Sequence, residues 1–156
     1  MSIPPIDRNG LEVLEHEECL RLLGHAHLGR IGVTSGALPL IFPVNYRLDG
    51  GELLFRTAVG TKLDAATRGT IVAFEVDDFD AVSHAGWSVV VTGRARRLAP
   101  ADAEARLSRA PIARWAPGPD GNTVAVSLDM VSGRRLPSLG AANADLAVDH
   151  VVAQTG

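Results

Sequence analysis

The stretch that decides the fold is residues 38–57, LPLIFPVNYRLDGGELLFRT. Asp49-Gly50-Gly51 near its centre predicts a tight hairpin turn, because two-residue hairpin loops need the left-handed backbone that Gly and Asp tolerate. The flanking residues 38–48 and 52–57 are rich in apolar residues and predict two strands. The chain is therefore expected to contain an antiparallel hairpin.

Two prolines interrupt the first of these strands. Pro39 and Pro43 each lack the backbone N–H that a sheet ladder uses, so proline in a strand indicates an edge, a bulge or the start of the strand. Main-chain groups of residues 42–46, FPVNY, that stay outside a ladder could contact a planar heterocycle. The alternative is a bulged edge strand without a ligand.

The rest of the chain alternates short strands, short helices and loops. Strands are predicted at residues 28–34, 71–76, 87–98 and 123–136, and helices at residues 15–23, 62–68 and 100–110. Residues 1–10 read as an irregular arm, 77–80 as an acidic loop and 111–121 as a loop. About six strands with hairpin-like links exclude a doubly wound sheet and fit an antiparallel barrel. The pattern alone leaves a sandwich open.

Composition indicates one domain. Hydrophobic residues are 46% of the 156 residues, enough for one core, which we place at residues 1–136 with a flexible tail at 137–156. The net charge of −3 argues against nucleic acid as a partner, and no apolar run reaches the roughly 18 residues of a membrane span. Residues 1–10 lack a signal-peptide layout, so a cytoplasmic protein is expected.

The segment with the clearest chemistry is residues 55–62, FRTAVGTK. It runs from a strand through a glycine turn into a helix start, where N–H groups and nearby cations together favour an anion. Arg56 could bind a phosphate in bidentate fashion and Lys62 could add a point charge. Thr57 and Thr61 could supply hydroxyls. The alternative is a capped strand-to-helix turn with two solvated cations.

Two other segments carry candidate binding residues. Trp87, in residues 86–93 (GWSVVVTG), suits stacking on a cofactor or anchoring an interface, and it could equally cap the core. Arg134 and Arg135 are adjacent on a strand and point to opposite faces, so at most one serves a given site. The alternative is two exposed cations.

The sequence holds little other chemistry. His16, His25 and His27 lack the spacing of metal ligands, so no metal site is predicted. Cys19 is the only cysteine, which excludes an internal disulfide; its place on an apolar helix face predicts a buried, inert thiol. No catalytic acid or base can be named.

Taken in order, these segments resemble the pyridoxamine 5′-phosphate oxidase-like family of split barrels that bind flavin mononucleotide (FMN). The resemblance covers roughly residues 11–136 and lies in LGRIGV (28–33), PVNY (43–46), FRT (55–57) with Lys62, GWSVVVTG (86–93) and GRR (133–135). It implies a mainly β fold with short helices, an antiparallel split barrel.

The resemblance also implies a homodimer with two cofactor sites, each built from both subunits. By that likeness Arg56 and Lys62 hold the FMN phosphate with Thr57 nearby, and the flavin ring lies along Pro43, Val44 and Asn45. The partner subunit is expected to contribute Trp87, Ser88 and Arg134.

The function implied is a flavin-dependent oxidoreductase that acts on a small molecule and takes electrons from a reduced donor. Residues 133–137, GRRLP, lack the histidine of the Arg-x-His element with which the oxidase recognises its substrate, so pyridoxamine phosphate is not expected. The alternatives are a reductase using a deazaflavin coenzyme, a non-catalytic dimer binding flavin or haem, and a barrel without cofactor. Candidate haem ligands are His25, His27 and His84.

Overall fold

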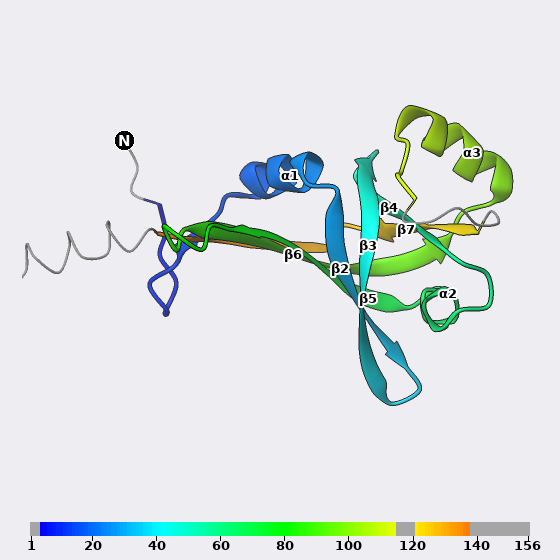
Figure 1. Cartoon of the computed structure of the whole chain (residues 1–156), viewed down its shortest axis with the longest axis horizontal. Helices are drawn as coiled ribbons and strands as arrows, with labels where there is room; N and C mark the ends of the chain where they lie inside the picture. The colour runs from blue at the N-terminus through cyan, green and yellow to red at the C-terminus, as the bar shows by residue number, and fades with distance from the viewer. Residues whose placement is uncertain (1–3, 115–120, 138–156) are drawn as a thin grey trace, which may run out of the picture.

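The computed structural model describes residues 4–114 and 121–137, and within them it contains eight strands and three helices (Figure 1). In chain order these are β1 (Glu12–Val13), α1 (His16–His25), β2 (Leu28–Ser35), β3 (Leu38–Asp49), β4 (Glu52–Thr57), α2 (Lys62–Ala66), β5 (Ile71–Phe79), β6 (Gly86–Arg97), α3 (Pro100–Arg109), β7 (Asn122–Ser127) and β8 (Met130–Leu136). No helix in these ranges is long and apolar enough to cross a membrane. The predicted tail, apart from Pro137, falls outside the described residues.

All the strand pairings are antiparallel, and six strands close on themselves. The sheet order is β1-β8-β6-β5-β2-β3-β4-β7, and a further pairing of β6 with β7 completes a barrel. One edge of β6 is shared: Gly86–Thr92 pairs with β8, whereas Ala95–Arg97 pairs with β7. This division of one strand edge between two partners makes the barrel split, which confirms the expected fold and excludes a sandwich.

The single strand predicted at residues 123–136 was wrong, because the structure has two strands there. β7 and β8 follow one another along the same edge of β6, and the ladder breaks at Leu128 and Asp129. Gly93 lies opposite this break, where a Cβ atom would come within 1.7 Å of the Ser127 carbonyl oxygen. The alternation of Val124, Val126 and Leu128 gave no sign of this step, since alternation reports which face is buried and not which strand is the partner.

The acidic loop predicted at residues 77–80 was also wrong over most of its length. Asp77, Asp78 and Phe79 continue β5, and their backbones pair with Ser88, Trp87 and Gly86 of β6 in that order. The side chains of the two acids are exposed. Low strand propensity is outweighed here because the backbone ladder is complete and the carboxylates reach solvent.

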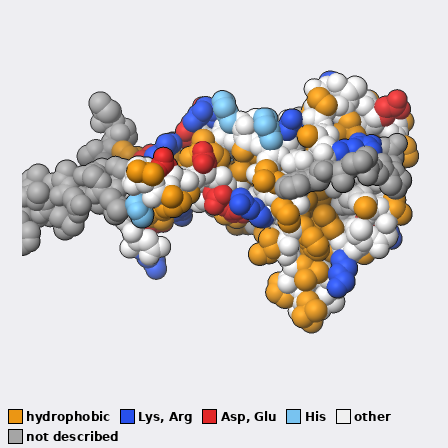
Figure 2. All heavy atoms as spheres, in the orientation of Figure 1, with side chains coloured by type: hydrophobic (Ala, Val, Ile, Leu, Met, Phe, Trp, Pro, Cys, Tyr) orange, Lys and Arg blue, Asp and Glu red, His pale blue; other side chains and the backbone are white. Residues whose placement is uncertain are grey.

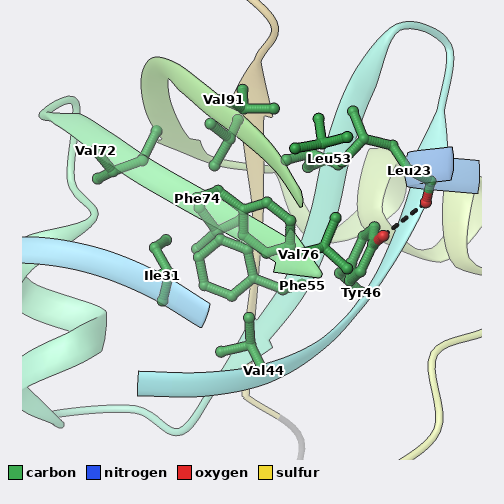
Figure 3. Packing of buried hydrophobic residues seen from close by; sticks show 14 of the residues in the cluster. Leu23, Ile31, Val44, Tyr46, Leu53, Phe55, Val72, Phe74, Val76 and Val91 are labelled. Carbon is green, nitrogen blue, oxygen red and sulfur yellow. Dashed lines mark hydrogen bonds between the residues drawn. The ribbon is translucent and has the colours of Figure 1, made fainter. Parts of the chain in front are cut away.

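The barrel interior is filled by the inward side chains of alternating strand positions (Figure 3). The rings of Tyr46 and Phe74 meet edge to face, with centroids 4.8 Å apart and planes at 69°. The Tyr46 hydroxyl donates a 2.6 Å hydrogen bond to the Leu23 carbonyl, so the core also fixes the end of α1. Burial raises the pKa of Tyr46, which keeps this donor protonated.

The three helices cover different parts of the barrel (Figure 1). α1 buries Cys19 as predicted, together with Leu22 and Leu23, and it runs two residues past the predicted end at residue 23. α3 packs outside the barrel against an apolar group that includes Leu54. α2 lies at the end of the barrel where β4 stops, and it is shorter than the predicted 62–68. This end positions the candidate site.

Candidate functional site

Three of the sequence-predicted residues lie on the outer face of the barrel, near the end of the β3–β4 ladder. The ladder ends with the pair Tyr46 and Phe55, and both side chains are buried inside the barrel. Because side chains alternate along a strand, Asn45 and Arg56, one step further along, point to the outer face. Pro43 points outward by the same alternation and is exposed.

The β3 edge beside these residues fits the sequence prediction. β4 pairs with β3 only from Tyr46 to Asp49, so the ladder does not extend to the part of β3 that carries Pro39 and Pro43. The two prolines are four residues apart, so both imide nitrogens face this side. The Val44 side chain is only 6% exposed and belongs to the core. The Tyr46 N–H donates to the His27 carbonyl, and by alternation the main chain of Val44, two residues away, also faces β2, where it pairs with Gly29. The main-chain groups on the open side of this edge are those of Pro43 and Asn45.

The segment that follows α3 contacts Asn45. Its Nδ2 donates a 2.9 Å hydrogen bond to the carbonyl oxygen of Ala113. This contact brings Arg114, the next residue, to the same part of the surface. Sequence analysis missed both residues, since nothing in the local pattern links them to a position 68 residues earlier.

The β4–α2 corner, residues 56–64, differs from the prediction in one respect. The turn is capped, as the alternative interpretation expected: Thr61 is the helix cap, and its Oγ1 accepts from the Asp64 N–H at 3.1 Å. However, α2 has only five residues, and the Gly60 N–H is already bonded to the Asp64 carboxylate at 3.1 Å. The cations Arg56 and Lys62, rather than helix N–H groups, are therefore what the corner can offer an anion.

A buried carboxylate organises this corner. The Asp64 side chain is 1% exposed and accepts five hydrogen bonds from four segments of the chain. We call these residues the Asp64 cluster; its donors are Asn122 Nδ2 (2.7 Å), Arg97 Nη2 (2.8 Å), Thr57 Oγ1 (3.0 Å), Gly60 N (3.1 Å) and Arg68 Nη2 (3.3 Å).

The balance of effects keeps Asp64 negative. Burial alone would raise the pKa of this carboxyl, but the hydrogen bonds, led by that from Asn122, hold the pKa well below its usual range. The alternation of the strands explains the geometry, because Thr57 and Asn122 are paired and point inward where the barrel ends. The carboxylate of α2 thus closes that end.

The cluster redefines one predicted ligand and adds residues that sequence analysis missed. The Thr57 hydroxyl donates to Asp64 rather than standing ready to donate to a phosphate. Asp64 itself had a local signal, since Thr61-Lys62-Leu63-Asp64 fits the capping pattern in which an acid stands three residues after the cap. Asn122 and Arg97 had none, because they are 58 and 33 residues away along the chain.

The remaining predicted residues lie at the other end of β6. Ser88 pairs directly with Arg134, and Trp87, which packs against the edge of the core, pairs with Arg135. Nine residues separate Ser88 from Arg97 along β6, which corresponds to about 30 Å of strand. A single chain therefore does not bring these three side chains to the β4–α2 corner.

Arg134 has a partner in its own chain. Its Nε donates to Asp7 Oδ2 at 2.7 Å, and its Nη1 donates to the Gly133 carbonyl at 2.9 Å. The hydrogen bond from Arg134 lowers the pKa of Asp7. The N-terminal arm, expected to be irregular, is thus tied to β8, also through the pairing of β1 with β8.

The histidines proposed as haem ligands are spread over different contacts. His25 Nδ1 lies 3.0 Å from the Arg21 carbonyl, and His27 Nδ1 accepts from Arg47 Nη1 at 2.8 Å. His84 has a φ of 57° in the connection between β5 and β6. Within residues 4–114 and 121–137, no three His, Cys, Asp or Glu side chains group as metal ligands.

A family model places the fold and these segments in a known group. The model for pyridoxamine 5′-phosphate oxidase matches residues 15–135, from the start of α1 to the end of β8. The chain belongs to this family. The match spans both the β4–α2 corner and the β6–β8 ladder, so both ends of the candidate site lie inside the family's domain.

Similar proteins and solved structures support the assignment to the pyridoxamine 5′-phosphate oxidase family. An uncharacterized protein of Mycobacterium tuberculosis is 36% identical over 128 residues, 79% of this chain and 84% of that protein. The FAD binding protein from Mycobacterium smegmatis is 37% identical with a TM-score of 0.69, over 80% of this chain and 98% of that one. The FAD and haem binding protein of the same organism, 18% identical with a TM-score of 0.60, covers 80% of this chain and 72% of that one and shares the fold.

Proposed function

We propose that this chain binds a flavin nucleotide with a phosphate at the β4–α2 corner and the ring along β3. The observation that carries the proposal is that Arg56 and Lys62 flank a turn that the buried Asp64 holds in place. A guanidinium and an ammonium are the side chains that bind phosphate in proteins. FMN, which has one phosphate, is the form that matches one such corner.

The outer face beside the corner suits the rest of the cofactor. Pro43 and Asn45 point outward on the same face as Arg56, and their main-chain groups on the open edge of β3 suit the polar edge of a planar ring. The similarity to the FAD binding protein of Mycobacterium smegmatis supports a flavin over other phosphate compounds. A bound flavin supplies hydride transfer, and the protein supplies binding and orientation. The function we propose is accordingly a flavin-dependent oxidoreductase acting on a small molecule.

The proposed site needs a second copy of the chain. Trp87, Ser88 and Arg134 lie at the far end of β6, so they can reach the cofactor only from a partner subunit. The outer sheet face offers a surface for that partner. A groove of about 420 Å³ runs there between Arg30, Ile41, Glu75 and Val90 among others.

Apolar exposure on this face supports a homodimer further. Leu38 and Ile41 on the β2–β3 hairpin are 65% and 74% exposed, and hydrophobic side chains gather over this projecting hairpin (Figure 2). Exposed apolar patches of this kind mark protein interfaces. Ile41→Asp should convert the dimer to a monomer in sedimentation velocity. A protein that is monomeric before the change would contradict the homodimer.

Cofactor binding is tested by visible absorption spectra of the purified protein after separate additions of FMN, FAD, a deazaflavin coenzyme and haem. We expect one flavin per chain. The double variant Arg56→Ala/Lys62→Ala should abolish flavin binding and leave the dimer intact. The control Arg21→Ala/Arg109→Ala removes the same charge from the exposed faces of α1 and α3 and should bind flavin normally. Retained binding in the first variant would contradict the site.

The same spectra separate the alternatives. Preference for the deazaflavin coenzyme would keep the site and identify a reductase that uses this coenzyme. Binding of haem alone would identify a haem protein instead. Reduction of the bound flavin by a nicotinamide donor, followed by reoxidation by a defined acceptor, is the result expected of an enzyme, and a flavin that stays oxidised would indicate a binding protein.

A further inference from the structure

Neither the family resemblance nor the cations Arg56 and Lys62 explain why Asp64 lies at the β4–α2 corner. A fully buried carboxylate beside a proposed phosphate site works against anion binding by its charge. It is also the least exposed polar side chain of the corner, at 1%. Such a group persists when its hydrogen bonds compensate for burial, and the five bonds of the Asp64 cluster do so.

The contacts of Asp64 fall on both sides of the turn that carries the two cations. Thr57, bonded at 3.0 Å, is the residue after Arg56, and Gly60, bonded at 3.1 Å, lies two residues before Lys62. Through Asn122 and Arg97 the same carboxylate ties the turn to β7 and to the end of β6. Asp64 therefore holds both sides of the turn that carries Arg56 and Lys62.

We propose that Asp64 is the positioning residue of the phosphate site: it fixes the turn so that Arg56 and Lys62 meet one phosphate together. This inference rests on the proposed function. It also assigns the predicted ligand Thr57 a different role, because its hydroxyl serves Asp64 and acts on the phosphate only through the shape of the turn.

Charge and position predict opposite results for Asp64→Asn. Loss of a negative charge near a phosphate would by Coulomb attraction alone tighten FMN binding. Loss of a carboxylate that accepts five hydrogen bonds lets the turn relax, because an amide cannot accept from all five donors. The positioning role therefore predicts weaker FMN binding. Riboflavin, which has the ring but no phosphate, should bind the variant as it binds the wild type.

The test measures dissociation constants of FMN and riboflavin by fluorescence titration at fixed ionic strength. For Asp64→Asn we expect the FMN constant to rise about tenfold or more, equivalent to about 1.4 kcal/mol, with the riboflavin constant unchanged. Equal weakening of both ligands would show a merely structural role, and unchanged or tighter FMN binding would overturn the proposal. If the wild type binds neither ligand, the proposed function itself fails and this inference fails with it.

A milder pair of variants covers the case in which Asp64→Asn does not fold. Thr57→Val removes one of the five bonds and should weaken FMN but not riboflavin, whereas Thr57→Ser keeps the hydroxyl and should restore FMN binding. The control is Thr67→Val, a buried threonine of the same region whose hydroxyl donates to the Leu63 and Asp64 carbonyls and not to the carboxylate. An equal FMN loss in Thr67→Val would overturn the proposal.

Discussion

A cluster of charged side chains lies at each end of β4, with a carboxylate at the centre of one cluster and a guanidinium at the centre of the other. At its last residue, Thr57, the strand meets the Asp64 cluster, a buried carboxylate surrounded by donors. At its first residue, Glu52, it meets what we call the Arg106 cluster, a nearly buried guanidinium surrounded by acceptors; its members are Arg106, Asp49, Glu52, Arg96 and Arg109.

The two clusters differ in role, because the Arg106 cluster stabilises the fold and the Asp64 cluster lies at the proposed binding site. Arg106 donates to Asp49 Oδ2, the Asp49 carbonyl and Glu52 Oε2, each at 2.7 Å, and so fastens α3 to the β3–β4 hairpin. The Arg106 cluster holds three arginines and two carboxylates. Among the described residues, Asp64 is the one carboxylate of its cluster and accepts from two arginines, and Arg56 and Lys62 lie on the same turn. The Asp64 end therefore has more cations for each carboxylate and is the end at which we propose an anion, whereas the Arg106 end fastens α3 to the barrel.

The largest effect is expected from Arg106→Ala. The change leaves Asp49 and Glu52 without their main partner, which for a buried ion pair costs about 3–5 kcal/mol. Urea unfolding followed by circular dichroism measures the loss. FMN affinity, measured below the unfolding transition, should stay the same because the cluster lies at the other end of β4.

Arg109→Ala is the matched control on the same helix. Arg109 also reaches Asp49, at 3.4 Å, but its side chain is 63% exposed, so we expect a loss of less than about 1 kcal/mol. Similar losses in the two variants would contradict the bracing role of Arg106. A drop in FMN affinity in Arg106→Ala would show that the two ends of β4 are coupled.

Gly121→Ala should give the next largest effect, now at the Asp64 end. A Cβ at residue 121 would come within 1.9 Å of the Thr57 carbonyl oxygen, so β7 and β4 must move apart where Thr57 and Asn122 meet Asp64. Overpacking of this kind costs about 1–3 kcal/mol, and we expect weaker FMN binding with it. Gly24→Ala, where a Cβ meets nothing within 4 Å, should be neutral or stabilising. An equally harmless Gly121→Ala would contradict the close approach.

The two clusters also show how far the sequence could be interpreted. The strands around Asp49-Gly50-Gly51 were predictable, because turn chemistry and alternation are local. The Thr61 cap was predictable for the same reason. The partners of Asp64 and Arg106 were not, since Asn122 and Asp49 lie 58 and 57 residues from them along the chain.

Local sequence patterns also gave no sign that part of the outer face of β4 is buried. Leu53 and Phe55 are buried inside the barrel, and alternation alone would place Leu54, between them, in solvent. Leu54 is fully buried because α3 covers the outer face there. Strand alternation identifies one buried face, and only the tertiary fold shows that a helix buries the second.

Acid should destabilise the wild type through both clusters, and Asp64→Asn should remove one contribution. The pKa of Asp64 is lowered in the fold, so its share of stability is complete above its unfolded pKa, near 4, and is lost as pH falls toward the folded pKa. The free energy of unfolding should therefore fall between about pH 5 and pH 2, less steeply in the variant. Urea titrations across this range measure both slopes. Equal slopes would mean that Asp64 is not ionised in the fold.

The smallest effects are expected from the two arginines that donate to Asp64. Arg97 comes from β6 with a 2.8 Å bond and a side chain 37% exposed, whereas Arg68 lies just beyond α2 with a 3.3 Å bond and a side chain 58% exposed. Arg97→Gln should cost about 1 kcal/mol and Arg68→Gln less than about 0.5 kcal/mol, because solvent screens the more exposed pair more strongly. Thermal unfolding of the two variants side by side resolves this order. A larger loss in Arg68→Gln would place the stabilisation of Asp64 within its own turn instead of between the turn and the barrel, and Asp64 would then fix α2 without fixing the strand end that carries Arg56.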